Sequence, residues 1–295
     1  MTRTNIFELL AENNTIGNDV ERLDGLFAYT KCFETDYEYW HTEVSWTLKE
    51  FVDSYCFSEW KNRHRCIDVK DFLNTVRYDE ILIRAKENSI DDFLTLIEII
   101  YNFWHLAVQH FTNGTEYYNY SKLKNGACTA KELKNIMDEC LSEYNQRAFY
   151  FPDEQKCIIT EDSPQVTAAA EATEPEISLE IVRYNHRQLA GDIIKKKAIL
   201  KTLGDYLEGR KKEISNINAT LYKNITGALN NLNIRHNNTN PENKSYYHRA
   251  VAEMPQKELE AHYDDLYQLI LLAILEMDNV QRQRDMNDLV QKVSQ

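Results

Sequence analysis

The sequence predicts an all-α protein made of two helical domains. Only 8 glycines and 5 prolines occur among 295 residues, fewer turn-forming residues than a sheet-rich protein of this size needs. No proline lies in residues 1–151, so no helix breaker interrupts that region. Hydrophobic residues make up 43% and charged residues 27%, an ordinary globular balance. The length is a soft indication of two domains.

Residues 1–152 form the first predicted domain, which is rich in aromatic residues and matches no family pattern. Apolar residues at steps of three and four predict a helix over 33–48. A second helix is expected over 89–111, capped by Ser89, and a third over 129–149, where Thr129 and Glu132 resemble a capping box. Asp68 suggests the start of a short helix. The expected inner faces of the three long helices are, in chain order, Phe33, Tyr37, Trp40, Val44 and Leu48; Phe93, Ile97, Ile100 and Trp104; and Leu133, Ile136, Met137, Cys140 and Leu141.

Residues 153–177 are predicted to be a flexible acidic linker. The segment carries one basic and seven acidic residues, and its centre consists mainly of Ala, Thr, Glu and Pro. Such a composition offers little apolar surface to offset the loss of chain entropy on folding.

Residues 178–295 form the second predicted domain, an antiparallel helical bundle. One helix is expected over 178–213, with Lys197 placed on its inner face through its methylene stem. The next is expected from a cap at Ser215 or Asn216 to Arg235, followed by the polar loop 236–244. The last helix starts near Pro255, a favourable first helical position. Its predicted inner face is Leu259, Tyr263, Leu266, Ile270, Ala273, Met277 and Val280.

Charge is distributed unevenly along the chain. The net charge of −13 argues against general affinity for nucleic acid. Residues 1–152 contribute −9, the linker −6 and residues 178–295 +2. Residues 178–234 contain 10 basic and 5 acidic residues, which makes this stretch the favoured surface for RNA. The alternative is a solvated helical face with a local surplus of lysine.

No targeting signal, cofactor motif or metal site is recognisable. The amino terminus lacks the apolar run of a signal peptide, and no apolar stretch is long enough to cross a membrane. A cytoplasmic location follows as an expectation, with no membrane contact. The six cysteines are scattered without a C-x-x-C pair, so reduced thiols are expected and a zinc site is not. The absence of a Gly-rich phosphate loop and of a G-x-S-x-G elbow argues against NTPases and α/β-hydrolases.

Three aromatic or histidine-containing segments are weaker candidates for function. The basic stretch Trp60–Arg65 could touch RNA, although a solvated loop is the preferred interpretation. His105 and His110 are five residues apart, the wrong spacing for two metal ligands on one helix, and are interpreted as core or boundary residues. Tyr117, Tyr118 and Tyr120 could stack on bases or contact a partner.

The stretch most able to carry chemistry is 230–238, where a helix is expected to end in a polar loop. Arg235 is permanently charged and presents a forked donor surface suited to phosphate. His236 carries an imidazole, the side chain that most often serves as a general acid or base. The expected substrate-binding residues are Asn231, Asn233, Asn237 and Asn238, whose amides can bind ribose or phosphate oxygens. The alternative is simple helix termination: Asn tolerates the left-handed conformation, and Arg and His complement the helix dipole.

RNA cleavage without metal requires three groups. A base takes the 2′-hydroxyl proton, a cation stabilises the phosphorane, and an acid protonates the leaving 5′-oxygen. One Arg and one His, doubled across a dimer two-fold, would supply that set.

Residues 178–295 resemble a HEPN domain of the abortive-infection type. The resemblance rests on the helix end Asn231–Asn238 (NLNIRHNN) and on the following apolar helix Tyr263–Ala273. Arg235 matches the signature arginine and His236 the polar residue beside it. The signature histidine would fall at 240–242, where none stands; the next one is His248. Three alternatives remain open: His236 is catalytic, the loop folds back to deliver His248, or the domain is inactive.

The resemblance implies a metal-independent endoribonuclease toxin of bacterial antiphage defence, with Arg235, His236 and His248 as catalytic candidates. It also implies RNA as the substrate, no cofactor and a homodimer formed through residues 178–295. Residues 1–152 would then bind a protein partner or a phage trigger. The alternative function is a catalytically inactive scaffold that binds RNA or protein, or an adaptor in a defence complex.

Overall fold

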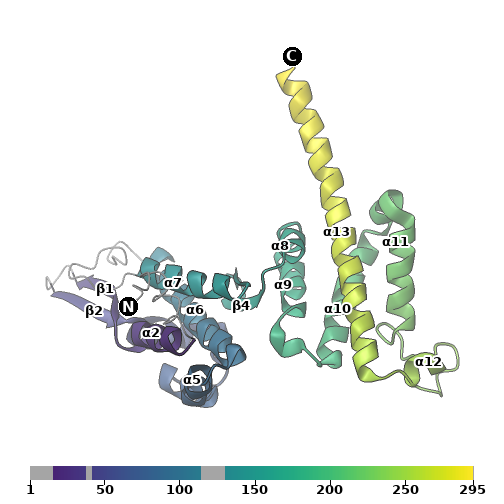
Figure 1. The fold of residues 1–295 in the computed structure, drawn as a ribbon. Helices are drawn as coiled ribbons and strands as arrows, with labels where there is room; N and C mark the ends of the chain where they lie inside the picture. Colours follow the sequence, from purple (N-terminus) through teal and green to yellow (C-terminus); the bar gives the residue numbers. More distant parts are fainter. Residues whose placement is uncertain (1–15, 38–41, 114–129, 295) are drawn as a thin grey trace, which may run out of the picture. The chain divides into compact units, whose positions relative to one another are not determined.

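A computed structural model describes residues 16–37, 42–113 and 130–294 (Figure 1). The described chain is mostly helical, as predicted, with two small two-stranded sheets, β1–β2 and β3–β4. It divides into two compact units, Met1–Ile159 and Thr160–Gln295.

In the first unit, helices surround the apolar helix α6 (Ile90–Asn113). α6 contacts α2 (Ile16–Ala28), α3 (Leu48–Phe51), α5 (Tyr78–Lys86) and α7 (Ala130–Glu143). The predicted inner-face residues Phe93, Ile97 and Ile100 are fully buried. The predicted cap Ser89 accepts a hydrogen bond from the Asp92 amide at 3.3 Å. The smaller helical segments are Val52–Cys56, Phe57–Glu59, Lys61–Arg63 and α4 (Val69–Thr75).

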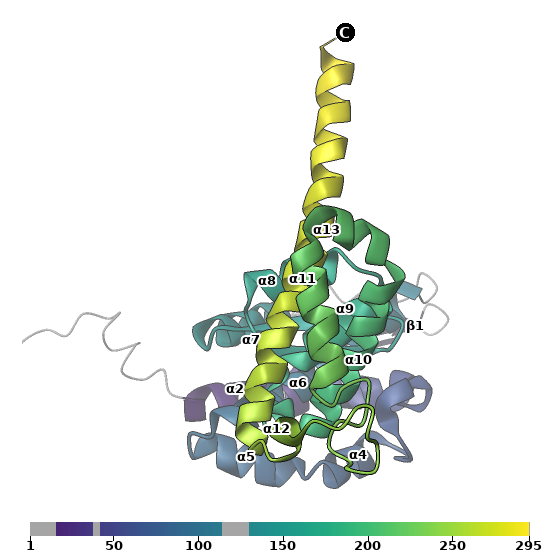
Figure 2. The ribbon, with the colours of Figure 1, turned by 90° about the vertical axis from the view of Figure 1, so that its right-hand side faces the viewer.

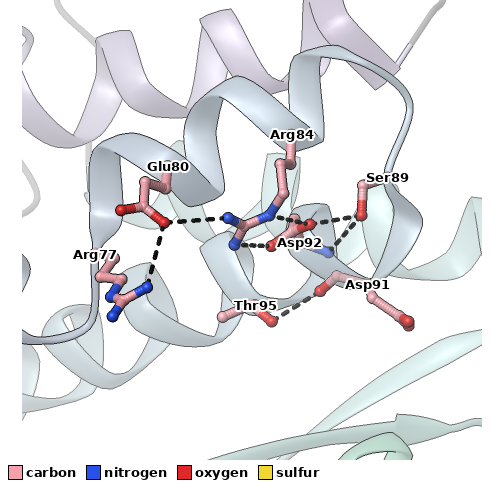
Figure 3. A network of polar contacts seen from close by, with 7 residues as sticks. All are labelled: Arg77, Glu80, Arg84, Ser89, Asp91, Asp92 and Thr95. Carbon is pink, nitrogen blue, oxygen red and sulfur yellow. Dashed lines mark hydrogen bonds and ion pairs between the residues drawn. The ribbon is translucent and has the colours of Figure 1, made fainter.

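The junction between α5 and α6 shows how polar side chains position this central helix (Figure 3). Arg84, on α5, donates two hydrogen bonds of 3.0 and 2.8 Å to Asp92 in the first turn of α6. Asp92 also accepts from the Ser89 hydroxyl at 2.7 Å, and Arg84 reaches Glu80 at 3.5 Å. The planar guanidinium of Arg84 forms two hydrogen bonds to the same carboxylate, a geometry that restricts how α5 and α6 can be oriented. We therefore interpret this network as structural.

The helix predicted over 33–48 is wrong. The segment forms strands β1 (Lys31–Tyr37) and β2 (Thr42–Thr47), paired antiparallel with Phe33 opposite Trp46 and Thr35 opposite Val44. Several of its residues are threonine, valine and aromatic types that favour strands. Phe33 is fully buried and stacks on Phe51 at 5.1 Å between ring centroids. Over so short a segment, the spacing of the apolar residues fits both the helical period and the strand period. Pairing between the two strands decides which structure forms. Trp40, also assigned to this helix, lies outside the described residues.

The helix predicted over 129–149 ends earlier than expected. α7 stops at Glu143, and β3 (Gln146–Phe151) pairs with β4 (Lys156–Glu161). Asn145 adopts a left-handed backbone with φ 53°, which ends the helix. The predicted cap Thr129 lies outside the described residues.

The flexible linker predicted over 153–177 is also wrong. Its first part completes the β3–β4 sheet, and the rest forms α8 (Pro164–Glu171) and the start of α9 (Pro175–Tyr184). Pro164 and Pro175 each occupy the first turn of a helix, where a missing amide costs nothing. Val166 and Ala169 are buried, and α8 packs on α9 and α13. Small alanines let helices approach closely, so this segment buries more surface than its composition suggests.

The second unit is a helical bundle of α8, α9, α10 (Ile193–Gly209), α11 (Lys211–Asn231) and α13 (Gln256–Val293), with the short helix α12 (Arg249–Ala252). Figure 2 shows α11 and α13 side by side, in agreement with the contacts between them. The helix predicted over 178–213 is interrupted at residues 185–192 by the turn Arg187–Leu189 and by Gly191, which has φ +79°. The buried lysine of α10 is Lys196 rather than Lys197.

Two further helix boundaries differ from prediction. α11 begins at Lys211 and is kinked at Asn218, whose side chain accepts from the Leu221 amide at 3.0 Å. α11 ends at Asn231 instead of Arg235. α13 begins beside Pro255 as predicted, and its predicted inner face is buried from Leu259 to Met277. Beyond the bundle it continues as a single helix, drawn in yellow in Figure 1, on which every residue from 281 to 294 is exposed.

Candidate functional site

The loop that follows α11 is folded back on itself around one buried asparagine. Asn233 has a left-handed backbone with φ 61° and ends the helix. The Asn233 amide donates to Asn238 Oδ1 at 2.7 Å, and the Asn238 amide donates to Asn233 Oδ1 at 3.2 Å. Asn238 is fully buried, and its Nδ2 donates to the Tyr246 carbonyl at 2.7 Å. The His248 amide donates to the Asn238 carbonyl at 2.9 Å. Asn233 and Asn238 therefore shape the loop, and the substrate-binding role predicted for Asn238 does not fit its burial.

Arg235 points from this loop onto α10. Its Nη2 lies 2.7 Å from Glu208 Oε2 and 3.5 Å from Asp205 Oδ1, and it donates to the Gly204 carbonyl at 3.1 Å. The Arg235 side chain is 15% exposed, whereas those of Asp205 and Glu208 are each 58% exposed. The buried Nε of Arg235 has no partner within the described part of the chain. Arg235 is therefore held in place by its two carboxylate contacts, while one of its hydrogen-bond donors remains unsatisfied.

The two candidate histidines lie at the same end of α11. The His236 ring stacks on Tyr246, with centroids 4.0 Å apart and an angle of 16° between the planes. His248 is exposed, and its Nε2 lies 3.1 Å from Asn231 Oδ1 on the last residue of α11. The Asn238 backbone connects them, since it donates to the His236 carbonyl at 3.1 Å and accepts from the His248 amide. The loop thus folds back and brings His248 to the helix end, which corresponds to the geometry of the second of the three alternatives above.

The remaining asparagines differ in their accessibility. Asn237 is exposed, and its Oδ1 accepts from the Thr239 hydroxyl at 3.1 Å. Asn231 is exposed and paired with His248. These two side chains can face a ligand, whereas Asn233 and Asn238 are used within the loop.

The sequence does not indicate that several further residues shape this site. Tyr263 is fully buried on α13, and its hydroxyl donates to the Leu232 carbonyl at 3.0 Å, which anchors the end of α11. Tyr246 supports the His236 ring. Asp205 and Glu208 are three residues apart on α10 and so share a face, a signal that could have suggested a partner for a nearby cation.

The α11 end therefore offers one cation, two imidazoles and two accessible amides. One imidazole is exposed to solvent and one is backed by an aromatic ring. Such a set can bind a phosphodiester and move protons on either side of it. Arg235 contributes only if the phosphate displaces the carboxylates that it now contacts.

The weaker candidates are structural where the chain is described. Trp60 is buried, and its Nε1 donates to the Gln155 carbonyl at 3.0 Å, so its ring cannot stack on a base. Lys61 donates to the Asp153 carbonyl at 2.6 Å. His105 stacks on Tyr150 with centroids 3.7 Å apart, and burial lowers its pKa to about 4, helped by the charge on Lys134. Tyr117, Tyr118 and Tyr120 lie outside the described residues.

Among the residues that the structure describes, no group of His, Cys, Asp and Glu side chains could hold a metal ion. The described cysteines are buried thiols: Cys32, Cys56, Cys66, Cys140 and Cys157. Burial and the nearby Glu59 raise the pKa of Cys56 to about 12, which keeps its thiol protonated at neutral pH. No described helix combines the length and the apolar character that a membrane span requires.

Comparison with known proteins adds no relative: no family model, curated protein or solved structure matches the chain.

Proposed function

We propose that the α11 end is a metal-independent RNA-cleaving site of the HEPN type, and that the protein acts as an endoribonuclease toxin in antiphage defence. The observation that supports the proposal is the folded-back loop, in which the His248 amide donates to the Asn238 carbonyl and His248 Nε2 lies 3.1 Å from Asn231 Oδ1, at the helix end that Arg235 and His236 follow. Because both imidazoles come from the same chain, a base and an acid are available without residues from a second copy.

The chemistry assigned to this site is a transesterification. The exposed His248 takes the proton of a ribose 2′-hydroxyl, and the 2′-oxygen forms a bond to phosphorus. The bond from phosphorus to the 5′-oxygen breaks, and His236 donates a proton to that leaving oxygen. Arg235 stabilises the extra negative charge on the phosphorane. The products are a 2′,3′-cyclic phosphate and a 5′-hydroxyl, and no oxidant or metal is consumed.

The proposal includes a resting state. Glu208 and Asp205 hold the guanidinium of Arg235 that a phosphate would have to contact. Both carboxylates are more than half exposed, so their interaction with Arg235 is screened and weak enough to be exchanged for a phosphate. Residues 1–152 are proposed to bind the trigger of this exchange.

The test uses His248→Ala, because an exposed side chain can be removed without risk to the fold. Cleavage of total RNA is expected to fall by on the order of a hundredfold or more. His262→Ala, on α13 of the same unit, is the matched control and should cleave normally. Cleavage that persists in a chelator and leaves cyclic phosphate ends would support the mechanism.

Arg235→Ala should also abolish cleavage and growth arrest on induced expression in a bacterial host. Thermal unfolding of that variant must be measured in parallel, because Arg235 joins α10 to the loop. A folded Arg235→Ala protein that arrests growth as strongly as the wild type contradicts the proposal, as does cleavage that a chelator abolishes.

A second candidate function is a catalytically inactive scaffold that binds RNA. The observation that favours it is the low exposure of Arg235 together with its two carboxylate contacts. It predicts RNA affinity that falls with added salt, without cleavage. Affinity that does not depend on salt would argue against it.

A further inference from the structure

The part of α13 that projects beyond the bundle carries an apolar stripe. Beyond Met277, this helix contributes no further buried residue to the bundle core. The side chains of Met286, Leu289 and Val293 are 58%, 53% and 74% exposed, and Leu272, still within the bundle, is 45% exposed. Single exposed apolar residues are ordinary, but several on one helix are not.

These residues follow a heptad repeat. They occur at alternating steps of three and four along one side of the helix, the spacing of the a and d positions of a coiled coil. The complete series is Leu272, Leu275, Asn279, Arg282, Met286, Leu289 and Val293. The buried residues Leu259 to Met277 face the bundle core, so the stripe belongs to a second, separate face of α13.

The stripe is complementary to itself when a second helix runs in the opposite direction. In that register Leu272 faces Leu289 of the second copy, and Leu275 faces Met286. Asn279 faces Arg282, so the central polar layers pair an amide oxygen with a guanidinium. In a parallel pair, by contrast, Arg282 would face Arg282, which like charge opposes.

Charge also permits this association. The whole chain has a net charge of −13, which opposes self-association in general. Residues 278–294 are balanced, with three acidic and three basic side chains. Arg282 contacts Asp278 on its own helix at 2.5 Å through Nε, which leaves its terminal nitrogens as donors for a second chain.

From these observations we infer that α13 pairs with α13 of a second copy of this chain, antiparallel, through the stripe from Leu272 to Val293. Residues 285–293 of each copy lie along the exposed face of the other bundle near Leu272, where Gln268 and Asp265 are also exposed. The two α11 ends then point in opposite directions, and each acts with its own histidines. This inference does not depend on RNA cleavage.

Sedimentation equilibrium of the full chain, at stepwise increasing concentration, tests the pairing. The wild type should reach twice the mass of one chain. Met286→Asp and Leu289→Asp should each weaken the dimer by on the order of a hundredfold, because each change places a charge in two symmetric layers. Ile194→Asp is the matched control: Ile194 is 82% exposed in the same unit but lies on α10, and its replacement should leave the dimer intact. A wild type that stays monomeric at every concentration overturns the inference, as does a dimer insensitive to both stripe variants.

Disulfide formation tests the direction of the helices. Chains with Leu272→Cys mixed with chains with Leu289→Cys should form a covalent dimer on oxidation, above the background of the wild type. Neither variant alone should do so. Covalent dimers of Leu289→Cys alone would show parallel helices and overturn the antiparallel arrangement.

Discussion

Two cations in the second unit, Lys196 and Arg235, are both largely shielded from solvent but are held in different ways. Lys196 Nζ lies 2.7 Å from Asp264 Oδ1 and 2.8 Å from Glu260 Oε1, and 5.3 Å from the centre of the Tyr184 ring. Burial alone would lower the pKa of Lys196, but the hydrogen bonds to the two carboxylates raise it above the usual value.

The carboxylates around Lys196 are themselves tied into the fold. Glu260 accepts from the Gly191 amide at 2.7 Å, and Asp264 accepts from the Tyr184 hydroxyl at 2.9 Å. Tyr184 stacks on Tyr267 with centroids 4.1 Å apart, so the cluster joins α9, α10 and α13. Arg235, by contrast, has an unsatisfied Nε, and both of its carboxylate partners are 58% exposed, against 18% for Glu260 and 49% for Asp264. We conclude that Lys196 serves the architecture, whereas Arg235 can exchange its partners.

Removing the Lys196 charge should have a greater effect on stability than any other change considered below. Lys196→Met leaves Glu260 and Asp264 without their cation, so the protein should lose about 3–4 kcal/mol of unfolding free energy. Urea denaturation measures it. Lys197→Met, the neighbouring substitution outside the cluster, should cost less than about 1 kcal/mol. Equal effects of the two variants would mean that Lys196 is not an architectural cation.

His105 in the first unit extends the comparison to a buried base that the fold keeps neutral. Its pKa is lowered to about 4, so the unfolded chain binds a proton between pH 4 and 6.5 that the folded chain does not. Stability should therefore rise with pH across this window. His105→Phe keeps the stacking on Tyr150 and should reduce that rise by about 3 kcal/mol. Unfolding curves at several pH values test this, and an identical pH dependence of both proteins would refute it.

Gly204 tests how closely the surroundings of Arg235 are packed, because its carbonyl accepts from Arg235. A Cβ at this position would lie 2.6 Å from Cδ1 of the fully buried Leu229, so α10 and α11 approach closely here. Gly204→Ala should destabilise the protein by about 1–2 kcal/mol, since the better helix propensity of alanine offsets part of the overpacking. Gly209→Ala meets no atom within 4 Å and should be neutral or stabilising. Thermal unfolding distinguishes the two.

Glu208→Gln should change stability least. Glu208 is 58% exposed, so its loss should change the unfolding free energy by less than about 1 kcal/mol. RNA affinity should nevertheless rise, because Arg235 loses its nearest counter-charge. Filter binding at several salt concentrations measures it, with Glu213→Gln as a control for net charge. Unchanged affinity in Glu208→Gln would mean that Arg235 is not the phosphate ligand.

The predictable parts of the fold are those in which one pattern dominates. The apolar faces of α6 and α13 repeat at helical spacing over many turns. Ser89, Asp68 and Pro255 need only local chemistry to begin a helix. Both caps are present, since Ser89 Oγ accepts from the Asp92 amide and Asp68 Oδ1 accepts from the Asp71 amide at 2.7 Å. Pro255 directly precedes α13, as expected.

The predictions for residues 33–48 and 153–177 are wrong for a shared reason. In the first segment, Phe33 pairs with Trp46 across two strands. In the second, Val166 and Ala169 are buried where α8 meets α9 and α13. Pairing between strands and close packing of alanines between helices both depend on partners outside the local segment, which local periodicity does not reveal.

The candidate site was predictable in its residue types but not in its connections. Arg235, His236 and His248 stand out in the sequence by their chemistry. That Asn238 is buried between Asn233 and Tyr246, and that Arg235 contacts Glu208, depends on how the loop closes. No local rule predicts these contacts.

The predominance of helices, the apolar faces of α6 and α13 and the heptad spacing beyond Met277 follow from the order of residues alone, because periodicity and local capping are properties of neighbouring residues. Tertiary packing was needed to establish that 31–37 and 42–47 pair as strands, that 164–177 pack as helices and that Lys196 is paired more completely than Arg235. These outcomes depend on burial and on contacts between residues far apart in the chain. The sequence of a single segment does not specify such contacts.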